Sequence, residues 1–251
     1  MNKDKLDALI KLSRELGRED RGLAMLGEGN TSARVSAETF FVKASGTCLG
    51  TMREADVVEC RFDALLPLLK KSDLSDAEIE KALLDSRVDS KARKPSVEAL
   101  FHAYCLGLPE VEFVGHTHGT AVNGILCSPR AREFANRRMF PDEIVCCGVA
   151  SVLVPYVDPG IPLAQAIRHH TEEFIRAHQR QPRVVLMENH GIITLGRTAE
   201  AVLSSMSMAE KAARIWLAAA ALGGPVYLSD EHVKRIAGRP DEHYRQRALN
   251  L

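Results

Sequence analysis

Short β-type runs alternate with helical segments along most of the chain, and this alternation constrains the fold more than any other feature of the sequence. Residues 184–187 and 192–195 are two apolar runs separated by only four residues, which is typical of neighbouring strands. Helical apolar spacing extends over 96–106, 163–178 and 198–222. The pattern therefore predicts an α/β protein.

The remaining expected elements fit the same class. Leu6, Leu9 and Leu16 keep helical spacing, so an amphipathic helix is expected near the N-terminus. No internal repeat and no Pro/Ser-rich linker marks a boundary. We expect residues 1–251 to form a single domain with a charged tail or short helix from about residue 222. Further strands are expected at 31–35, 39–43, 57–60, 111–118, 144–147 and 152–154, and two helices within 61–86.

The composition excludes several classes of function. Hydrophobic residues make up 45% of the chain and charged residues 26%, which is typical of a globular protein with a full core. Basic and acidic residues each number 33, so no net charge attracts nucleic acid or an anionic membrane. No apolar run reaches the roughly 20 residues of a membrane span, and the first residues do not resemble a signal peptide. We expect a cytoplasmic protein.

The cysteines favour the same location. The chain has six, none of them in a C-x-x-C pair, and several lie in apolar stretches such as Val145-Cys146-Cys147. This usage indicates buried, reduced thiols of an intracellular protein rather than a disulfide framework.

The strongest local signal is the sequence Gly115-His116-Thr117-His118-Gly119 at the end of an expected strand. Residues i and i+2 of a strand point to the same face, so both imidazoles can reach one ion at about 2.0–2.1 Å. Taken alone, an H-x-H pair is equally compatible with a polar strand end.

A third histidine, His190, falls between the two apolar runs at 184–187 and 192–195. A lone histidine in such a turn is more often a structural residue. Together with His116 and His118 it completes a set of three imidazoles, and three protein ligands with one open position are the usual form of a catalytic zinc site. No cysteine is placed to close the site.

Glu98 is expected in the first turn of the helix that follows Pro95. An acidic residue there also suits the helix dipole, which is its plain structural explanation. Its functional interpretation is a metal ligand or a general base that takes a proton from carbon. His102, four residues further on the same helix face, either orients Glu98 or fills space, and we favour the second role.

Small polar turns form the last group of candidates. They suit a phosphate or carboxylate through backbone N–H groups and hydroxyls, although loops are made of such residues anyway. No Walker, Rossmann or G-x-S-x-G pattern is present. The turns are Gly29-Asn30-Thr31-Ser32, Ser45-Gly46-Thr47 and Pro95-Ser96.

Taken in order, these motifs resemble the class II aldolase/adducin family. The matching pieces are GEGNTSARV, VKASGT, KPSVEALFHAY, VGHTHGTAV and LMENHGIITLG, which together run from residue 27 to residue 196. The family includes aldolases for fuculose and rhamnulose phosphates, a ribulose-phosphate 4-epimerase and metal-free adducin head domains. The resemblance implies a three-layer α/β/α sandwich with a central, mainly antiparallel sheet, and assembly as a homotetramer.

The resemblance also implies roles for individual residues. His116, His118 and His190 would hold zinc, with manganese or cobalt as alternatives, and Glu98 would bind the metal and act as base or acid. Asn30, Ser45, Gly46 and Ser96 would hold the phosphate of a sugar-phosphate substrate. The implied activity is a metal-dependent lyase that cleaves or forms a C–C bond in a small ketose or sugar phosphate through an enediolate that the metal stabilises.

Two departures from the family pattern affect the substrate more than the metal. Val97 stands where the phosphate aldolases often carry a second serine, and Lys43 could compensate for the missing hydroxyl. The stretch 139–148 contains no tyrosine to act as a proton donor, which leaves Tyr227 and Tyr244 as candidates.

Three alternatives remain open from the sequence. A sugar-phosphate epimerase or a sugar-acid decarboxylase could use the same residues. An adducin-like interaction domain would be expected to lose the ligands, and here all four candidate positions are present. A zinc hydro-lyase such as carbonic anhydrase also uses three histidines, but the helical stretches argue against its mostly β fold.

Overall fold

The computed structural model describes residues 2–71, 74–242 and 244, and within these residues seven strands form one sheet. Their spatial order is β3-β2-β1-β4-β7-β6-β5. β4, which carries the H-x-H pair, therefore lies in the middle of the sheet between β1 and β7. The strands are β1 (Asn30–Arg34), β2 (Thr39–Lys43), β3 (Val57–Arg61), β4 (Phe113–Thr117), β5 (Val152–Val154), β6 (Val184–Met187) and β7 (Gly191–Gly196).

The sheet is mixed. Five of its strand pairs run antiparallel, whereas β5 and β6 run parallel at one edge. The expectation of a mainly antiparallel sheet is corrected at this edge. The parallel pair arises because the long helix α8 (Ile161–His178) connects the end of β5 to the start of β6, and a crossover of this length returns the chain in the same direction.

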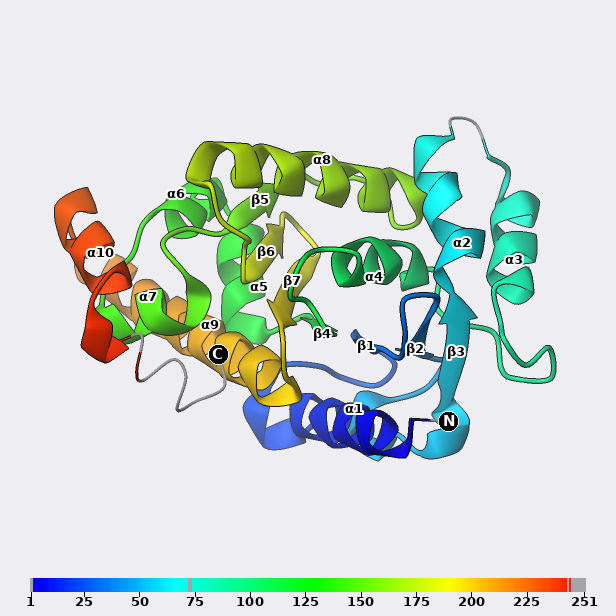
Figure 1. Ribbon diagram of the computed structural model, residues 1–251. Helices are drawn as coiled ribbons and strands as arrows, with labels where there is room; N and C mark the ends of the chain where they lie inside the picture. Colours follow the sequence, from blue (N-terminus) through cyan, green and yellow to red (C-terminus); the bar gives the residue numbers. More distant parts are fainter. Residues whose placement is uncertain (1, 72–73, 243, 245–251) are drawn as a thin grey trace.

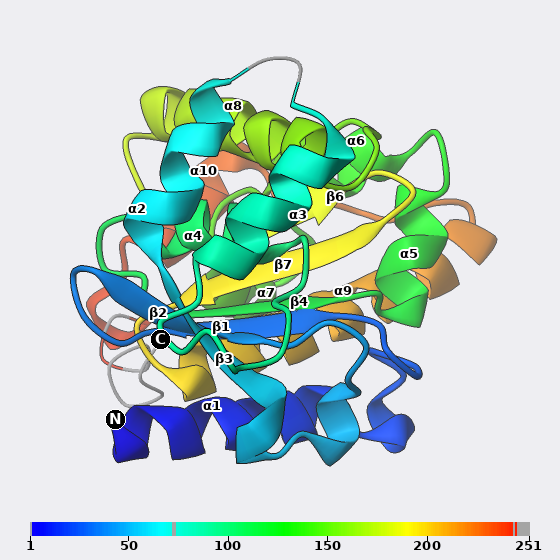
Figure 2. The same cartoon turned by 90° about the vertical axis from the view of Figure 1, so that its right-hand side faces the viewer.

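Helices lie against both faces of the sheet (Figures 1 and 2). In both views α1 and α9 lie on one side of the strands, while α4 and α8 lie on the other. No helix of the described residues is long and apolar enough to cross a membrane. The helices other than α8 are α1 (Lys3–Leu16), α2 (Phe62–Leu65), α3 (Asp76–Asp85), α4 (Ala99–Leu106), α5 (Thr120–Leu126), α6 (Ala131–Asn136), α7 (Pro141–Cys147), α9 (Ala199–Ala221) and α10 (Asp230–Ala237).

Alternation along the strands divides the core into two apolar clusters. Phe113 and Ile192 pack with α1 and α9 in one cluster, whereas Val114 and Ile193 pack with α4 and α8 in the other. This division follows the period of two in a strand, which sends successive side chains to opposite faces. His116 shares the parity of Val114 and therefore faces the side that carries α4.

One strand prediction is wrong. Residues 144–147 lie in the helix α7, not in a strand. Pro141 stands at the first helical position, with Asp142 and Glu143 in the first turn, and these residues favour the start of a helix. The run Ile144–Cys147 is buried on all sides, so its apolar character carries no periodicity that could separate helix from strand.

The predicted C-terminal tail contains the short helix α10, and residues 243 and 245–251 of that tail lie outside the described residues. All six cysteines are free thiols, as expected. Four are buried, but Cys48 and Cys127 are exposed, which corrects the expectation for these two.

Candidate metal centre

The central strand β4 positions two of the three histidines. His116 pairs in register with Asn30 of β1 on one side and with Ile193 of β7 on the other, and it is fully buried. His118 follows directly after the strand, and its backbone N–H donates to the carbonyl of Leu23 at 3.0 Å. The two neighbouring strands and this loop contact fix the directions in which both imidazoles point.

The third histidine lies in the tight connection between β6 and β7. Glu188–His190 form a three-residue loop in which Asn189 takes a left-handed conformation, with φ of 54°. Asparagine tolerates this conformation better than most residues. The side-chain amide of Asn123 on α5 donates to the carbonyl of His190 at 3.0 Å and holds the loop.

Gly191 allows the loop to approach β4. A Cβ atom there would lie 2.5 Å from the carbonyl oxygen of Thr117, 2.9 Å from Cδ2 of His118 and 3.1 Å from Cε1 of His116. The backbone at this point thus packs directly against two of the three imidazoles. Sequence reasoning did not identify this role, although the glycine next to His190 was visible.

The three imidazoles and the carboxylate of Glu98 converge on one point. One ring nitrogen from each of His116, His118 and His190 lies within 4.8 Å of the others. His116 Nε2 lies 3.1 Å from His118 Nε2 and 3.3 Å from Glu98 Oε1, and His190 Nε2 lies 3.6 Å from the same oxygen. Tetrahedral ligands about 2.0–2.1 Å from zinc are about 3.3 Å from each other, and these three separations are close to that value.

The hydrogen bonds around His116 support a cation at this point. Its Nδ1 lies 3.0 Å from the carbonyl oxygen of Ile192, which can only accept, so Nδ1 carries the proton. In the neutral ring, Nε2 then presents a lone pair to the Glu98 carboxylate. Two acceptors 3.3 Å apart repel each other unless a proton or a metal ion lies between them. The donor set of three imidazoles and one carboxylate fits a divalent metal.

Electrostatics at the site keep Glu98 ionised. Burial opposes the charge on Glu98, but His116 and His190 outweigh it and hold the pKa of the carboxyl well below its usual range. Burial likewise opposes the charge on His116, and the Glu98 carboxylate raises the pKa of that imidazole. Burial, with His116 and His190 nearby, lowers the pKa of His118 to about 4. A neutral imidazole and an ionised carboxylate are the forms that bind metal.

A buried polar layer lies beneath the site. His102 on α4 is fully buried, and its Nδ1 lies 2.7 Å from the hydroxyl of Ser32 on β1. Burial lowers the pKa of His102 to about 3, so the ring is neutral. Within the described residues, His102 Nε2 and Asn30 Nδ2 are buried atoms without a hydrogen-bond partner. His102 thus bonds to Ser32, and within the described residues it makes no hydrogen bond to Glu98, which agrees with a packing role.

The structure brings two of the predicted phosphate-binding residues together. Ser45 and Ser96 line one cleft of about 760 Å³. Their turns are joined because Ser45 N–H donates to Lys94 O at 2.9 Å and Ser96 N–H to Lys43 O at 3.4 Å. Gly46 adjoins Ser45 in a left-handed conformation, with φ of 72°.

Asn30 does not join this group. It is fully buried opposite His116 and is not one of the residues that line the cleft. Its predicted contact with phosphate stays a prediction, and its side-chain Nδ2 is a buried donor with no partner among the described residues. Val97 does line the cleft, where it is 36% exposed, next to Ser96.

Glu98 follows Ser96 closely, at the start of α4. The helix begins at Ala99, so Glu98 occupies the N-cap position rather than the first turn. Its backbone N–H donates to the Ser96 hydroxyl at 3.3 Å. The cleft and the histidine cluster therefore share one short segment of chain.

Lys43 is used differently from the role suggested by the sequence. Its ammonium is buried and donates to the carbonyls of Thr47 at 2.7 Å and Gly27 at 3.3 Å. Burial lowers the pKa of this amine. Lys43 thus stabilises the turns at Gly27 and Thr47 by hydrogen bonds to their carbonyls.

The tyrosine candidates lie in other surroundings. The Tyr227 hydroxyl donates to Glu133 at 2.7 Å and accepts from the indole N–H of Trp216 at 2.8 Å. Burial, together with Glu133, raises the pKa of Tyr227 to about 12. Tyr244 is 70% exposed. Neither side chain contacts the histidine cluster of its own chain.

Sequence reasoning also missed Glu28. Its carboxylate lies 3.8 Å from Nδ1 of His118 on the outer side of the cluster. Glu28 is the second residue of the GEGN motif, but no pattern in the sequence indicates that a loop at residue 28 lies close to the strand end at residue 118.

Comparisons with known proteins match most of the chain. The family of the class II aldolase and adducin N-terminal domain matches residues 7–217. The uncharacterized oxidoreductase YuxG of Bacillus subtilis (strain 168) is 32% identical over 203 residues, which cover 78% of this chain and 27% of YuxG. The chain thus spans about a quarter of that relative's length. A 3-oxo-tetronate 4-phosphate decarboxylase of Haemophilus influenzae is 26% identical over 231 residues, 90% of this chain and 94% of that protein.

Solved structures share the fold. An L-fuculose 1-phosphate aldolase superposes with a TM-score of 0.72 at 19% identity, covering 98% of both chains. An N-terminal class II aldolase domain from Thermoplasma acidophilum gives 0.68 at 25% identity, covering 84% of this chain and 93% of that one. Because the family match extends over most of the sequence, this chain belongs to the class II aldolase and adducin family.

Proposed function

We propose that this chain is a divalent-metal-dependent lyase that cleaves or forms a C–C bond in a small ketose or sugar phosphate. His116, His118, His190 and Glu98 would hold the metal, and zinc suits three imidazoles well, with manganese or cobalt as alternatives. The observation that carries the proposal is the convergence of these four side chains, with separations of 3.1, 3.3 and 3.6 Å between their ligand atoms. An adducin-like interaction domain has no need of such a cluster.

The metal, when bound, would act as a Lewis acid that polarises a substrate carbonyl. The other steps fall to this chain's own residues. Glu98 is ionised, so it can accept the proton of a substrate hydroxyl as the C–C bond breaks and return a proton to the carbon that gains the electron pair. A carboxylate that alternates between these two states supplies both proton transfers of an aldol cleavage.

The cleft next to Glu98 would orient the far end of the substrate. The Ser45 and Ser96 hydroxyls and the turn at Gly46 present donors to an anionic group there. The Ser96 hydroxyl accepts from the Glu98 N–H, so its own proton remains available to a phosphate oxygen. Binding of the phosphate and placement of the carboxylate would thus be linked through one segment of three residues.

Metal content of the purified protein, followed by assays on ketose 1-phosphates, tests the proposal. We expect about one zinc per chain and release of dihydroxyacetone phosphate that a chelator abolishes and added zinc restores. A chain that neither contains metal nor takes it up would contradict the enzymatic assignment and favour an interaction domain.

Decarboxylation is the second candidate, because the Haemophilus influenzae decarboxylase matches along nearly its whole length. Loss of CO₂ from a 3-oxo acid also leaves an electron pair next to a carbonyl, and the same carbon then takes a proton. The four converging side chains would serve this reaction equally well. Release of CO₂ from 3-oxo-tetronate 4-phosphate, with no cleavage of ketose phosphates, would select this activity.

The homotetramer and the cytoplasmic location remain predictions. Light scattering coupled to size-exclusion chromatography measures the first directly. The proposed chemistry does not depend on either.

A further inference from the structure

A second group of metal-binding side chains lies on the solvent-exposed side of α8. Ile167 and Phe174 of this helix pack in the core, whereas His169, His170 and Glu173 have side chains that are 63%, 29% and 48% exposed. Glu173 follows His169 by four residues and His170 by three, and side chains at these spacings are neighbours on a helix surface. We call these three residues the α8 cluster.

The ligand atoms of the α8 cluster converge. One ligand atom from each of the three side chains lies within 4.8 Å of the others. His169 Nε2 lies 3.4 Å from Glu173 Oε1, and His170 Nδ1 lies 3.2 Å from Glu173 Oε2. Ligand atoms that share one tetrahedral zinc ion are about 3.3 Å apart, so both separations are close to the required value. Exposed side chains also rotate readily, which lets them adjust to an ion.

An ordinary ion pair on this helix has a simpler form. Arg168 and Glu172 make such a pair, in which one cation contacts one carboxylate at 2.8 Å. Glu173 instead has an imidazole beside each of its two oxygens, and no Lys or Arg of the described residues forms an ion pair with it. Imidazole is the commonest metal ligand in proteins. The α8 cluster thus offers two nitrogen ligands and one oxygen ligand on a single turn of helix.

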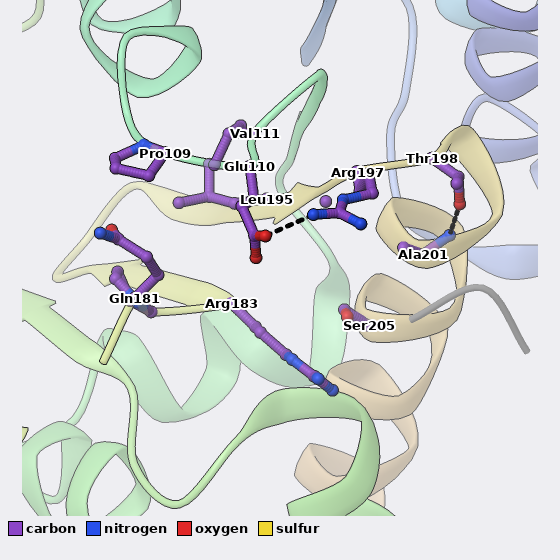
Figure 3. Close-up of a pocket in the computed structure, with 12 residues that line it drawn as sticks. Pro109, Glu110, Val111, Gln181, Arg183, Leu195, Arg197, Thr198, Ala201 and Ser205 are labelled. Carbon is purple, nitrogen blue, oxygen red and sulfur yellow. Dashed lines mark hydrogen bonds and ion pairs between the residues drawn. The ribbon is translucent and has the colours of Figure 1, made fainter. Parts of the chain in front are cut away.

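Polar side chains that line a cavity elsewhere in the molecule show no such convergence. A cavity of about 540 Å³ lies beside the ends of β4 and β7 that are remote from the histidine cluster (Figure 3). Arg183 and Gln181 both line it, but the polar ends of their side chains point away from each other. One small ligand could not contact both, so this cavity lacks the shared focus that the α8 cluster has.

The donor set decides which ions fit. Two imidazoles and one carboxylate are the protein ligands of several catalytic zinc sites, which keep a further position for water. Imidazole also suits Ni²⁺ and Cu²⁺, whereas Mg²⁺ and Ca²⁺ prefer a full set of oxygen ligands.

We propose that His169, His170 and Glu173 bind Zn²⁺, or another divalent ion that prefers imidazole, on the surface of α8, with water in the open position. The exposed side chains lose rotamer freedom when they bind, so the ion is held more weakly than at the buried histidine cluster and is lost on purification without added metal. The α8 cluster shares no ligand with the histidine cluster and is independent of the proposed lyase activity.

Nuclear magnetic resonance of the purified protein tests the α8 cluster directly. The imidazole Cε1–H signals of His169, His170 and the exposed His232 are followed while Zn²⁺ or Mg²⁺ is added. We expect the first two signals to shift together with Zn²⁺ and to saturate below about 1 mM. The His232 signal should stay in place, and Mg²⁺ should move none of the three. Each signal reports its own ring, so the result does not depend on whether the histidine cluster is occupied.

Three variants assign the ligands. Glu173→Gln keeps the size of the side chain but removes the carboxylate, and His170→Gln removes one imidazole. In both, we expect Zn²⁺ to bind at least about tenfold more weakly, as read from the His169 signal. Glu172→Gln removes the neighbouring carboxylate of the same helix, which pairs with Arg168, and it should bind Zn²⁺ as the wild type does.

The opposite results would overturn the proposal. These are signals of His169 and His170 that do not move with Zn²⁺, that move equally with Mg²⁺, or that move only as much as the His232 signal. Equal affinity for Zn²⁺ in Glu173→Gln and the wild type would likewise remove Glu173 from the site.

Discussion

Nε2 of His116 and Oε1 of Glu98 lie 3.3 Å apart, although one residue is on a central strand and the other is at the start of a helix. Each shifts the pKa of the other: that of the carboxyl is lowered and that of the imidazole is raised. On the other side of the His116 ring, Nδ1–H donates to the Ile192 carbonyl, and this bond fixes the tautomer of His116. Glu98 can therefore serve both as a ligand and as the group that moves protons.

Glu98→Gln separates these two roles. The amide oxygen can still reach a metal, but the amide cannot take a proton, so we expect zinc to be retained and turnover to fall by about 10²- to 10⁴-fold. Metal analysis and steady-state assays measure both quantities. Glu112→Gln, which changes a partly buried carboxylate paired with Lys5 outside the cluster, is the matched control and should leave both unchanged. Full activity of Glu98→Gln would remove Glu98 from the chemistry.

His116→Ala tests the ligand set. His116 is buried at the centre of the cluster, so its removal leaves two imidazoles and we expect loss of stoichiometric zinc. His232→Ala, which changes an exposed histidine on α10, should keep it. Circular dichroism establishes that both variants are folded. Zinc retained at one per chain after His116→Ala would refute the assignment of the H-x-H pair.

The sequence predicted the histidine set because strand alternation is a local property. An H-x-H pair at a strand end must share a face, and a histidine between two short strands must lie at a turn. The strand order, however, brings β1 next to β4 and β4 next to β7, and these pairings join segments far apart in the chain. No local pattern encodes them, and the family resemblance supplied only the general architecture.

The same limit explains the residues that were missed or misplaced. Asn123, Gly191 and Glu28 act through contacts with loops that are distant in sequence. The polar residues around Asn30 predicted a turn there. In the structure, Asn30 is the first residue of β1, and it is buried because it pairs with His116 of β4. The strand prediction for residues 144–147 was wrong for a different reason. In a short apolar run that is buried on all sides, the sequence shows no periodicity that distinguishes a helix from a strand.

Gly191→Ala tests the close approach between the β6–β7 loop and β4. The added Cβ would lie 2.5 Å from the Thr117 carbonyl oxygen and 2.9 Å from the His118 ring. The loop must move, so we expect a loss of about 1–3 kcal/mol in the free energy of unfolding and about 10- to 100-fold weaker zinc binding. Denaturant titration and metal competition assays measure these effects.

Gly124→Ala is the control for this substitution. The nearest atom to its new Cβ is Leu217 Cδ1, at an ordinary 3.7 Å, and the residue lies within α5. Alanine in a helix should raise stability by about 0.5–1 kcal/mol. Unchanged zinc affinity in Gly191→Ala would show that the loop does not position the ligands.

The buried His102 should make stability depend on pH. Burial lowers its pKa to about 3, whereas the unfolded chain has the ordinary value of about 6.5. Below pH 6.5 the unfolded state gains a proton that the folded state does not, so stability is lost as pH falls towards 3. The slope for one such group is at most about 1.4 kcal/mol per pH unit.

His102→Gln removes this contribution. In chelator-treated protein, we expect the free energy of unfolding to fall less steeply between pH 6 and pH 4 in the variant, whatever its stability at pH 7. His232→Gln changes an exposed histidine and should keep the wild-type slope. Identical slopes for His102→Gln and wild type would mean that His102 gains its proton in the folded state as readily as in the unfolded chain.

Val97→Ser tests the anion-binding role of the cleft beside Glu98. Val97 is 36% exposed and lies between Ser96 and Glu98 in the turn that leads to the carboxylate, so a hydroxyl there adds one donor to the cleft. One further hydrogen bond to a charged group contributes about 1.5 kcal/mol, so we expect KM for a phosphorylated substrate to fall about tenfold with little change in kcat. Val97→Ala removes the apolar group without adding a donor and should leave KM nearly unchanged. If both variants alter KM alike, the cleft recognises its substrate by shape, and the phosphate must bind elsewhere.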